Sequence, residues 1–363
     1  MIDISILIPY NTPVMSLHAV WACCGFDLSM LTVRSFRNAD PPRLLALWRK
    51  TQRCQYEYQE DYASTFPLSL NQLQTQILGL PMLNAASVML AFEEETLVGY
   101  IHTIFAPSLD GYTFDYTVGQ ICFLCIDPDC SDALGAASAL IHAGENYLAS
   151  RGAQKIFGGS PSPSAPFYTG FYGGGEAVGI LHSNKAVIDA FQAANYQIHQ
   201  QTRWFYYNIQ HSLTDFSAEM ASHYEFYSMK IGEVQKARTW WEGCSLANGM
   251  WYDAMAYSIQ EKRPVARLRV RVTCPDASPE MEDVSALYGR TWLASLVELR
   301  VHPDFPSERM QDILLDELIR YLIAHNQVFR IEAHAAEGSL LFILLRRKSW
   351  KERGNGSVFV KVL

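Results

Sequence analysis

The sequence predicts an α/β protein built from two similar halves. The first sign is an apolar run, Ile121–Ile126, that ends at Asp127-Pro128-Asp129 and leads through a turn of small residues into a helical pattern. A continuous apolar run of this length is typical of a central strand that is buried on both faces. The second sign is a weaker copy of this strand, turn and helix later in the chain. The third is length, because 363 residues exceed the usual size of one compact core.

Apolar periodicity predicts the elements of the first half in order. A strand is expected over Leu31–Phe36, followed by a helix whose apolar face includes Leu44 and Trp48. A second helix is expected over 70–78, and the next two apolar runs predict a hairpin. The remaining elements are the strand 121–126, a helix over 136–149, a strand that starts at 155 and a helix after Asn184. Between the last two lies a loop, 158–182, rich in glycine, proline and aromatic residues. A loop of this length is often functional, and it could shape an acceptor pocket, close as a lid or form a surface or dimer contact.

The second half repeats this order. The tripeptide that starts at Asp127 aligns without a gap to His302-Pro303-Asp304, a shift of 175 positions (127 to 302). The same shift carries the strand onto 296–301 and the apolar stripe of the helix onto Leu314, Leu315, Leu318, Leu322 and Ile323. Gly135 and Ala137 map to Met310 and Asp312, so the small-residue turn is lost in the copy. We interpret the pattern as a tandem duplication with a degenerate second repeat.

This interpretation divides the chain into three segments. Residues 1–30 form an N-terminal extension, residues 31–210 a first domain and residues 211–363 a second, degenerate domain. The extension is apolar-rich, but it lacks a basic region and is interrupted by Pro9 and Pro13. Neither a signal peptide nor a membrane-spanning helix is expected there.

Composition limits the classes of partner. The net charge is −8 and no long run of Lys or Arg occurs, so neither a nucleic-acid partner nor a membrane partner is expected. The eight cysteines lack the spacing of a disulfide framework or a zinc ribbon, which favours the cytoplasm and no metal site. Cys122 and Cys125 are expected on opposite faces of their strand, where they could not share a metal ion. A homo-oligomer stays open.

The turn before the 136–149 helix suggests an anion site. A helix that begins among small residues presents free backbone N–H groups and the positive end of its dipole, which suits a pyrophosphate. Downstream, Asn184 is expected to cap a helix whose apolar face includes Val187 and Phe191.

These two segments resemble motifs of the GNAT superfamily, the acyl-CoA-dependent N-acyltransferases. The family's pyrophosphate loop is Arg or Gln, two residues, Gly, one residue, then Gly or Ala. Gly135 and Ala137 fit this pattern, and Asp132 stands where Arg or Gln is usual. The segment from Asn184 to Tyr196 resembles the family's closing motif, a helix that begins at Asn. The paired halves are similar to tandem members of the superfamily.

The resemblance implies two tandem GNAT-like domains, each a mixed, mostly antiparallel twisted sheet flanked by helices. It implies acetyl-CoA as the acyl donor and direct transfer to an amine of a small molecule or a peptide. The cofactor contacts implied are the backbone groups of Leu124, Cys125, Ile126, Leu134, Gly135, Ala136 and Ala137, with Asn184 as a secondary contact.

Two proton-transfer groups that are frequent in the family have no counterpart here. Phe191 replaces a Tyr of the closing helix, and Gln120 replaces a Glu of the central strand. Tyr172, Asp115 and Tyr116 are the candidate catalytic residues in their place, unless the acceptor amine loses its proton to water. The alternatives are a non-catalytic scaffold that binds CoA or another protein, and a turn that is purely structural.

Overall fold

The computed structural model describes residues 31–56, 69–159, 179–209, 226–246, 249–273, 292–305, 308–326 and 328–363. The expected N-terminal extension, the expected boundary at 210/211, Tyr172 and most of the 158–182 loop lie outside these ranges. The first half denotes the described part of 31–209, and the second half denotes the described part of 226–363.

The described elements follow the order expected from the sequence. The first half contains β1 (Leu31–Ser35), α1 (Pro41–Tyr56), α2 (Leu70–Gln72) with a π-helical continuation (Leu73–Leu78), a 3-10 turn (Ala85–Ser87), β2 (Val88–Glu93), β3 (Thr96–Pro107), β4 (Phe114–Ile126), α3 (Ala133–Ala149), β5 (Lys155–Gly158), β6 (Ile180–Leu181), α4 (Lys185–Ala193) and β7 (Gln197–Asn208). The second half contains β8 (Tyr227–Glu233), α5 (Trp240–Leu246), β9 (Met250–Ser258), β10 (Pro264–Thr273), β11 (Trp292–Val301), α7 (Glu308–Asn326), β12 (Val328–Ala336), α8 (Leu340–Arg347) and β13 (Lys351–Val362).

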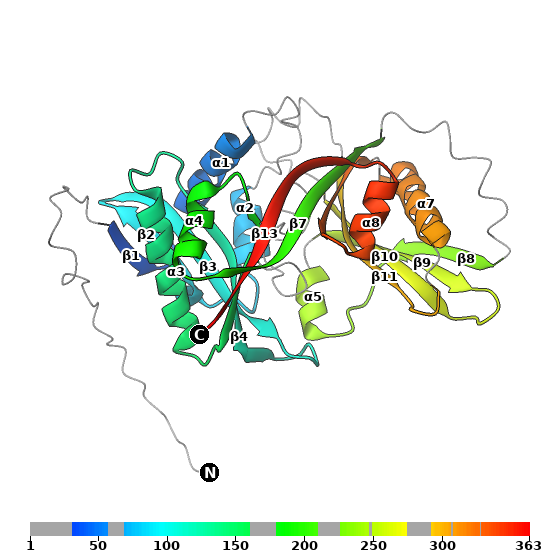
Figure 1. Ribbon diagram of the computed structural model, residues 1–363, viewed down its shortest axis with the longest axis horizontal. Helices are drawn as coiled ribbons and strands as arrows, with labels where there is room; N and C mark the ends of the chain where they lie inside the picture. The colour runs from blue at the N-terminus through cyan, green and yellow to red at the C-terminus, as the bar shows by residue number, and fades with distance from the viewer. Residues whose placement is uncertain are drawn as a thin grey trace, which may run out of the picture.

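All the described strands join one 13-stranded sheet. Its order is β1-β2-β3-β4-β5-β13-β7-β12-β11-β10-β9-β8, with β6 beside β13 (Figure 1). Two pairs are parallel, β4 with β5 and β11 with β12, and the other pairs are antiparallel. The predicted fold class, a mixed and mostly antiparallel sheet flanked by helices, is confirmed.

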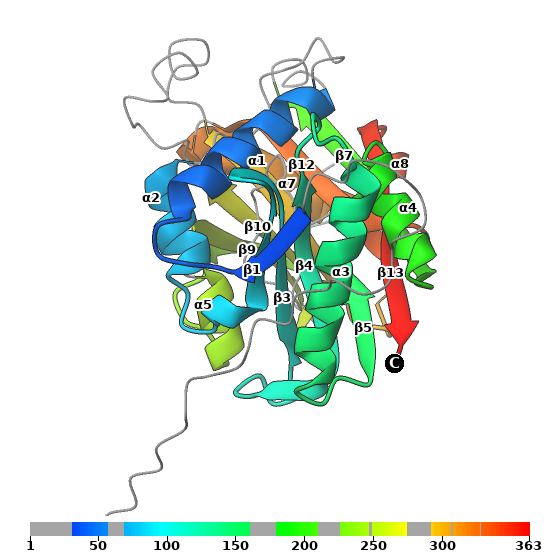
Figure 2. The same cartoon turned by 90° about the vertical axis from the view of Figure 1, so that its left-hand side faces the viewer.

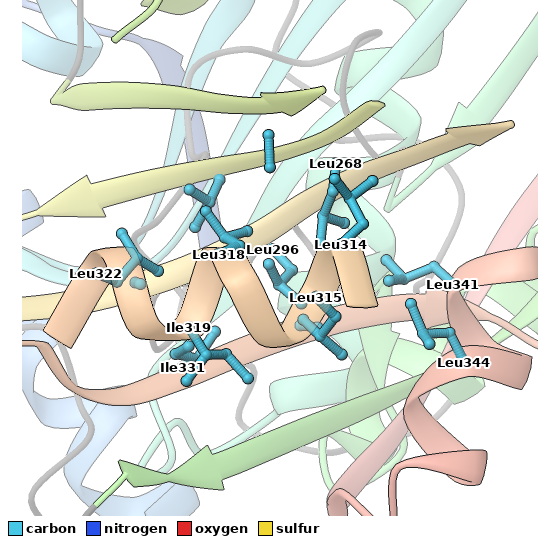
Figure 3. Close-up of a cluster of buried hydrophobic side chains, with 14 of the residues drawn as sticks. Leu268, Leu296, Leu314, Leu315, Leu318, Ile319, Leu322, Ile331, Leu341 and Leu344 are labelled. Atoms are coloured by element: carbon cyan, nitrogen blue, oxygen red, sulfur yellow. The ribbon is translucent and has the colours of Figure 1, made fainter. Parts of the chain in front are cut away.

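Helices cover both faces of the sheet. In the first half, α1 and α2 lie on one face and α3 and α4 on the other (Figure 2). Trp241 of α5 joins the α1 side, where it meets Phe114 edge to face with ring centroids 5.7 Å apart. In the second half, Leu314, Leu318 and Leu322 of α7 face the sheet beside the leucines of α8 (Figure 3). The apolar stripes that the sequence shows are therefore the surfaces that form the cores.

The duplication is visible in backbone detail. The ladder between β4 and β5 ends at the pair Ile121–Gly158, and the ladder between β11 and β12 ends at Leu296–Ala333. Both residues of the second pair lie 175 positions after those of the first (121 to 296, 158 to 333). Each central strand also carries one extra residue against its antiparallel neighbour, Cys122 in β4 and Val297 in β11, again 175 positions apart (122 to 297). An irregularity shared between the halves supports the tandem repeat.

The two halves exchange their last strands. β13 lies between β5 and β7, with Phe359 opposite Gly158 on one side and opposite Ile198 on the other. β7 in turn pairs with β12 of the second half, from Ala336–Thr202 to Arg330–Asn208. β7 and β13 therefore run side by side through the middle of the molecule and join its two halves (Figure 1).

Candidate functional site

The central strand of the first half has an open edge beyond β5. Gly159 N donates to Ile121 O at 3.0 Å, and β4 then continues from Cys122 to Ile126 with no ladder partner on that side among the described residues. We call this edge of β4, which has no strand beside it among the described residues, the opening; β5 ends at Gly158. Backbone groups at such an edge can bind an extended ligand as a strand would.

Alternation along β4 determines which groups face the opening. Asp127 N donates to Val98 O of β3 at 2.7 Å. Because successive peptide groups of a strand point to alternate sides, the N–H and C=O groups of Leu124 and Ile126 point away from β3, toward the opening. Cys125, also expected to contact a cofactor, directs its backbone to β3, where it pairs with Tyr100.

The extra residue of β4 also corrects the expectation for the two cysteines. A regular strand would place Cys122 and Cys125 on opposite faces, but the bulge at Cys122 changes the alternation. Both side chains pack into the core on the α1 side. Burial raises the pKa of both thiols, that of Cys125 to about 12. Among the described residues, no group of His, Cys, Asp or Glu side chains could hold a metal ion.

The turn expected to bind a pyrophosphate already holds a carboxylate. α3 begins after Asp132, and Gly135 N donates to Asp132 Oδ1 at 2.8 Å. A Cβ at position 135 would lie 2.1 Å from Asp132 Oδ2, so the glycine is required for this cap. Asp132 therefore acts as an N-cap, as Asp commonly does. An anionic ligand would have to displace the carboxylate to reach the N–H of Gly135.

A second carboxylate reaches the same turn from the β2–β3 hairpin. Ser131 Oγ donates to Glu93 Oε1 at 2.7 Å, and Cys130 Sγ donates to the same oxygen at 3.3 Å. These hydrogen bonds, the Ser131 hydroxyl first, lower the pKa of Glu93. Burial, with Glu93 beside it, raises the pKa of the Cys130 thiol to about 12. The turn thus already accommodates two carboxylates of the chain itself, and an anionic ligand would have to compete with both.

The other expected cofactor contact is at the start of α4. Asn184 occupies the N-cap position, but its side chain makes no capping hydrogen bond. Its N–H donates to Leu181 O at 2.9 Å. Asn184 therefore stands at the expected N-cap position, but its side chain does not make the expected capping hydrogen bond.

The two residues that replace the family's proton-transfer groups are both buried. Gln120 is 1% exposed, and its Oε1 has no hydrogen-bond partner in the described part of the chain. Phe191 stacks on Phe359 with ring centroids 5.1 Å apart and is fully buried. Phe191 therefore serves the core between α4 and β13.

Asp115 and Tyr116 lie at the far end of β4 from the turn. Asp115 accepts hydrogen bonds from the N–H and hydroxyl of Thr117, and Tyr116 is 53% exposed. Nine residues of strand separate Asp115 from Leu124, which corresponds to about 30 Å. The structure does not bring these two candidate catalytic residues to the turn.

Sequence reasoning did not select a pair of polar side chains, His182 and Ser357. The pair lies beyond the end of β5, where β6 pairs with β13. His182 Nε2 and Ser357 Oγ are 2.7 Å apart, and Ser357 Oγ donates to Gln201 Oε1 at 3.2 Å. Ser357 is fully buried, whereas His182 is exposed. Since the single hydroxyl hydrogen of Ser357 goes to Gln201, His182 Nε2–H donates to Ser357, which leaves Nδ1 able to accept a proton. Ser357 is contributed by β13, far away in the sequence, so no local pattern could have found the pair.

Comparison with known proteins identifies the architecture. Residues 47–171 match the model of the acetyltransferase (GNAT) family. A tandem GNAT protein from the clavulanic acid biosynthesis pathway has a similar structure, with a TM-score of 0.59 and 10% identity over 92% of this chain and 98% of that one. The chain has a tandem GNAT fold.

Two further structures share this tandem GNAT fold. A GCN5-related N-acetyltransferase from Sphaerobacter thermophilus aligns with a TM-score of 0.55 and 10% identity, covering 91% of this chain and 95% of that one. The N-myristoyltransferase of Saccharomyces cerevisiae with bound myristoyl-CoA aligns with a TM-score of 0.51 and 13% identity, covering 92% and 78%. No curated protein sequence matches the chain. No helix in the described part of the chain is long and apolar enough to span a membrane.

Proposed function

We propose that this protein is an N-acyltransferase that moves an acetyl group from acetyl-CoA to an amine of a small molecule or a peptide, and that the first half binds the acyl-CoA. The observation that carries the proposal is the opening along β4 beyond its last pair with β5, with the bulge at Cys122, which leads to the turn where Gly135 N donates to a carboxylate oxygen. The family match over residues 47–171 supports it.

In the proposed complex, β4 and the turn that follows it would bind different parts of the acyl-CoA. The free backbone groups of Leu124 and Ile126 would hold the extended pantetheine arm. The N–H groups of Leu134 and Gly135 would hold the pyrophosphate once Asp132 turns away. The expected contacts from Ala136 and Ala137 are corrected by the structure, because Ala136 N already donates to Asp132 O at 2.9 Å and Ala137 lies further inside the helix. The Asn184 side chain makes no capping hydrogen bond at the start of α4 and would contact the same ligand.

Direct transfer requires two proton movements. The amine nitrogen attacks the thioester carbonyl, the C–S bond breaks, the amine loses a proton and the departing thiolate gains one. We propose that His182 Nδ1 takes the amine proton, because Ser357 fixes the other ring nitrogen. Tyr172 remains a candidate proton donor that lies outside the described residues. We expect His182→Gln to lower kcat by about 100-fold with little change in KM, whereas equal activity would remove His182 from the mechanism.

The test of cofactor binding is calorimetric titration of the full chain with acetyl-CoA and with CoA. Gly135→Glu should abolish binding, because its side chain would fill the turn. Gly232→Glu is the matched control, since nothing lies within 4 Å of a Cβ at that position. Binding that survives Gly135→Glu would refute the turn as the site.

A second candidate function is a non-catalytic scaffold that binds CoA or another protein. Buried Gln120 and Phe191 favour it, since neither can carry a proton near neutral pH. Binding of acetyl-CoA without release of free thiol, across a panel of amines, would support it. We also propose the cytoplasm as the compartment, since the structure describes four cysteines as free thiols. The mass of the protein in solution would test whether it forms a homo-oligomer.

A further inference from the structure

A cavity of about 540 Å³ lies where the two halves meet, far from the turn of α3 in the sequence. The loop 107–111 of the first half forms one wall, and α5 with strands β9, β10 and β11 forms the others. Its volume is in the range of cavities that enclose small organic molecules. The bulge residue of the second half, Val297, lines it.

At the equivalent place in the first half, aromatic side chains pack against one another. There Phe123 stacks on Trp48 with ring centroids 4.7 Å apart and lies 5.1 Å from the ring of Tyr100. The shift of 175 positions carries Phe123 onto Glu298 and Cys125 onto Arg300. The strand registers then place Arg267, the partner of Arg300, where Tyr100 pairs with Cys125.

The same comparison places Arg269 of the second half where His102 stands in the first. His102 pairs with Phe123, and Arg269 pairs with Glu298, the equivalent of Phe123. A packed apolar face in one half is thus a charged, hollow face in the other. Packing alone gives no reason to exchange an aromatic stack for guanidinium groups beside an open volume.

Among the described residues, the ion pairs around the cavity join more guanidinium groups than carboxylates. Glu242 pairs with Arg238 and Arg269, and Arg269 also pairs with Asp253. On the opposite wall, Glu298 alone pairs with both Arg267 and Arg300. Four guanidinium groups therefore share three carboxylates. Within these described pairs one positive charge is in excess, in a protein whose net charge is −8.

The excess lies at Arg267 and Arg300. The side chain of Arg267 is 12% exposed and that of Arg300 is 62% exposed, so one guanidinium lies inside the wall and the other at its rim. A carboxylate that entered between them would form charge-assisted hydrogen bonds of the forked kind that arginine favours. Trp241 and Trp251 lie in the wall as buried side chains, and Leu109, which is exposed, and Val297 supply apolar lining for the rest of a ligand.

We propose that this cavity binds a small organic monocarboxylate, with its carboxylate held by Arg267 and Arg300 and its apolar body against the apolar lining at Leu109 and Val297. The first half helps to hold the site together. Trp241 N donates to Gly111 O at 3.0 Å, and the Tyr112 hydroxyl donates to Arg238 O at 3.0 Å. The site does not depend on acyl transfer, since it lies outside the opening of β4.

The first test uses benzoate and benzamide, which have the same shape and differ in charge, with the full chain at constant ionic strength. Arginine-directed labelling with phenylglyoxal is followed peptide by peptide by mass spectrometry. Benzoate should slow the labelling of Arg300 several-fold and leave Arg346 unchanged, and benzamide should change neither. Arg346 is a matched internal control, because its side chain is also 62% exposed and also pairs with a glutamate.

The second test measures thermal stability with the same two probes. Benzoate should raise the Tm of the wild type and of Arg346→Gln, but not that of Arg300→Gln. Equal labelling of Arg300 in benzoate and benzamide would overturn the proposal and leave the arginines as a structural ion-pair network. The labelling needs no variant, so it decides the matter even where Arg300→Gln fails to fold.

Discussion

At the scale of single residues, two carboxylates control access to the turn of α3. Asp132 caps the helix through Gly135 N, and Glu93 holds the preceding Ser131 and Cys130. In the proposed site, the Asp132 carboxylate occupies the N–H of Gly135 that a phosphate would need, and both carboxylates would repel an anion. The residue at position 132, which departs from the family pattern, is therefore expected to lower the affinity for an anionic ligand.

Asp132→Asn should tighten CoA binding. Asparagine caps helices about as well as aspartate, so the free energy of unfolding should change by less than ~0.5 kcal/mol. Loss of the negative charge should raise CoA affinity by about tenfold, or ~1.4 kcal/mol, measured by calorimetry. Asp304→Asn, which removes a charge at the corresponding turn of the second half, serves as the control. Weaker binding by Asp132→Asn would show that the carboxylate assists the ligand.

Buried histidines should make stability fall on acidification. His102 is fully buried, and burial lowers its pKa to about 3. The unfolded chain takes up a proton near pH 6.5, so between pH 6.5 and 3 it binds more protons than the folded chain. Stability is therefore present above pH 6.5 and is lost as the pH falls through this window.

The expected loss from His102 is about 2 kcal/mol between pH 6.5 and 5, at ~1.4 kcal/mol per pH unit. Denaturant unfolding at a series of pH values measures it. The stability difference between the wild type and His102→Gln should shrink as the pH falls, while exposed His142→Gln should follow the wild type. A constant difference would mean that His102 stays protonated or neutral in both states alike.

At the scale of elements, β5 and α4 pack closely because position 158 of β5 has no side chain. A Cβ at Gly158 would lie 2.4 Å from the ring of Phe191, which is itself held against Phe359. The closing helix can pack this close to the sheet only because position 158 is glycine. The opening along β4 begins at the same residue.

Gly158→Ala should destabilise the protein by roughly 1–3 kcal/mol, because Phe191 has no free space to move into. Urea unfolding measures the change, and Gly232→Ala, in open space, is the control. Phe191→Leu should cost stability alone but recover part of the loss when combined with Gly158→Ala. Strict additivity of the two changes would contradict the contact.

The sequence is sufficient for most elements and insufficient for their irregularities. It predicts the strand 121–126, the turn and the helix, because the periodicity of apolar residues reflects the local geometry of each segment. It does not predict the bulge at Cys122, since an extra residue leaves no mark on a continuous apolar run, and the expected faces of the two cysteines are therefore wrong. The His182–Ser357 pair depends on which strand lies beside β5, which local patterns do not encode.

At the scale of the whole molecule, the exchanged strands make each half incomplete without the other. β13 pairs with both β5 and β7, so residues 31–210 alone would leave both strand edges open. The division at 210/211 therefore stays a proposal about where one sequence repeat ends and the next begins. The sheet itself is continuous between the two halves.

We expect the fragment 31–210 to lack a cooperative unfolding transition. Circular dichroism during urea unfolding measures this, and mixing with the fragment 211–363 should restore the transition, since the second fragment supplies β13. The full chain, carried through the same purification, is the control. A sharp transition in the isolated first fragment would show that β13 is dispensable.

The position of β13 also has a consequence for biosynthesis. The 142 residues from 209 to 350 separate the end of β7 from the start of β13. At ~5–20 residues per second, the ribosome needs on the order of 10 s to supply the missing strand. During this interval the emerging first half exposes unpaired strand edges, which neighbouring nascent chains can bind. Cells under translational stress should therefore lose this protein to aggregation before they lose proteins whose sheets close in chain order.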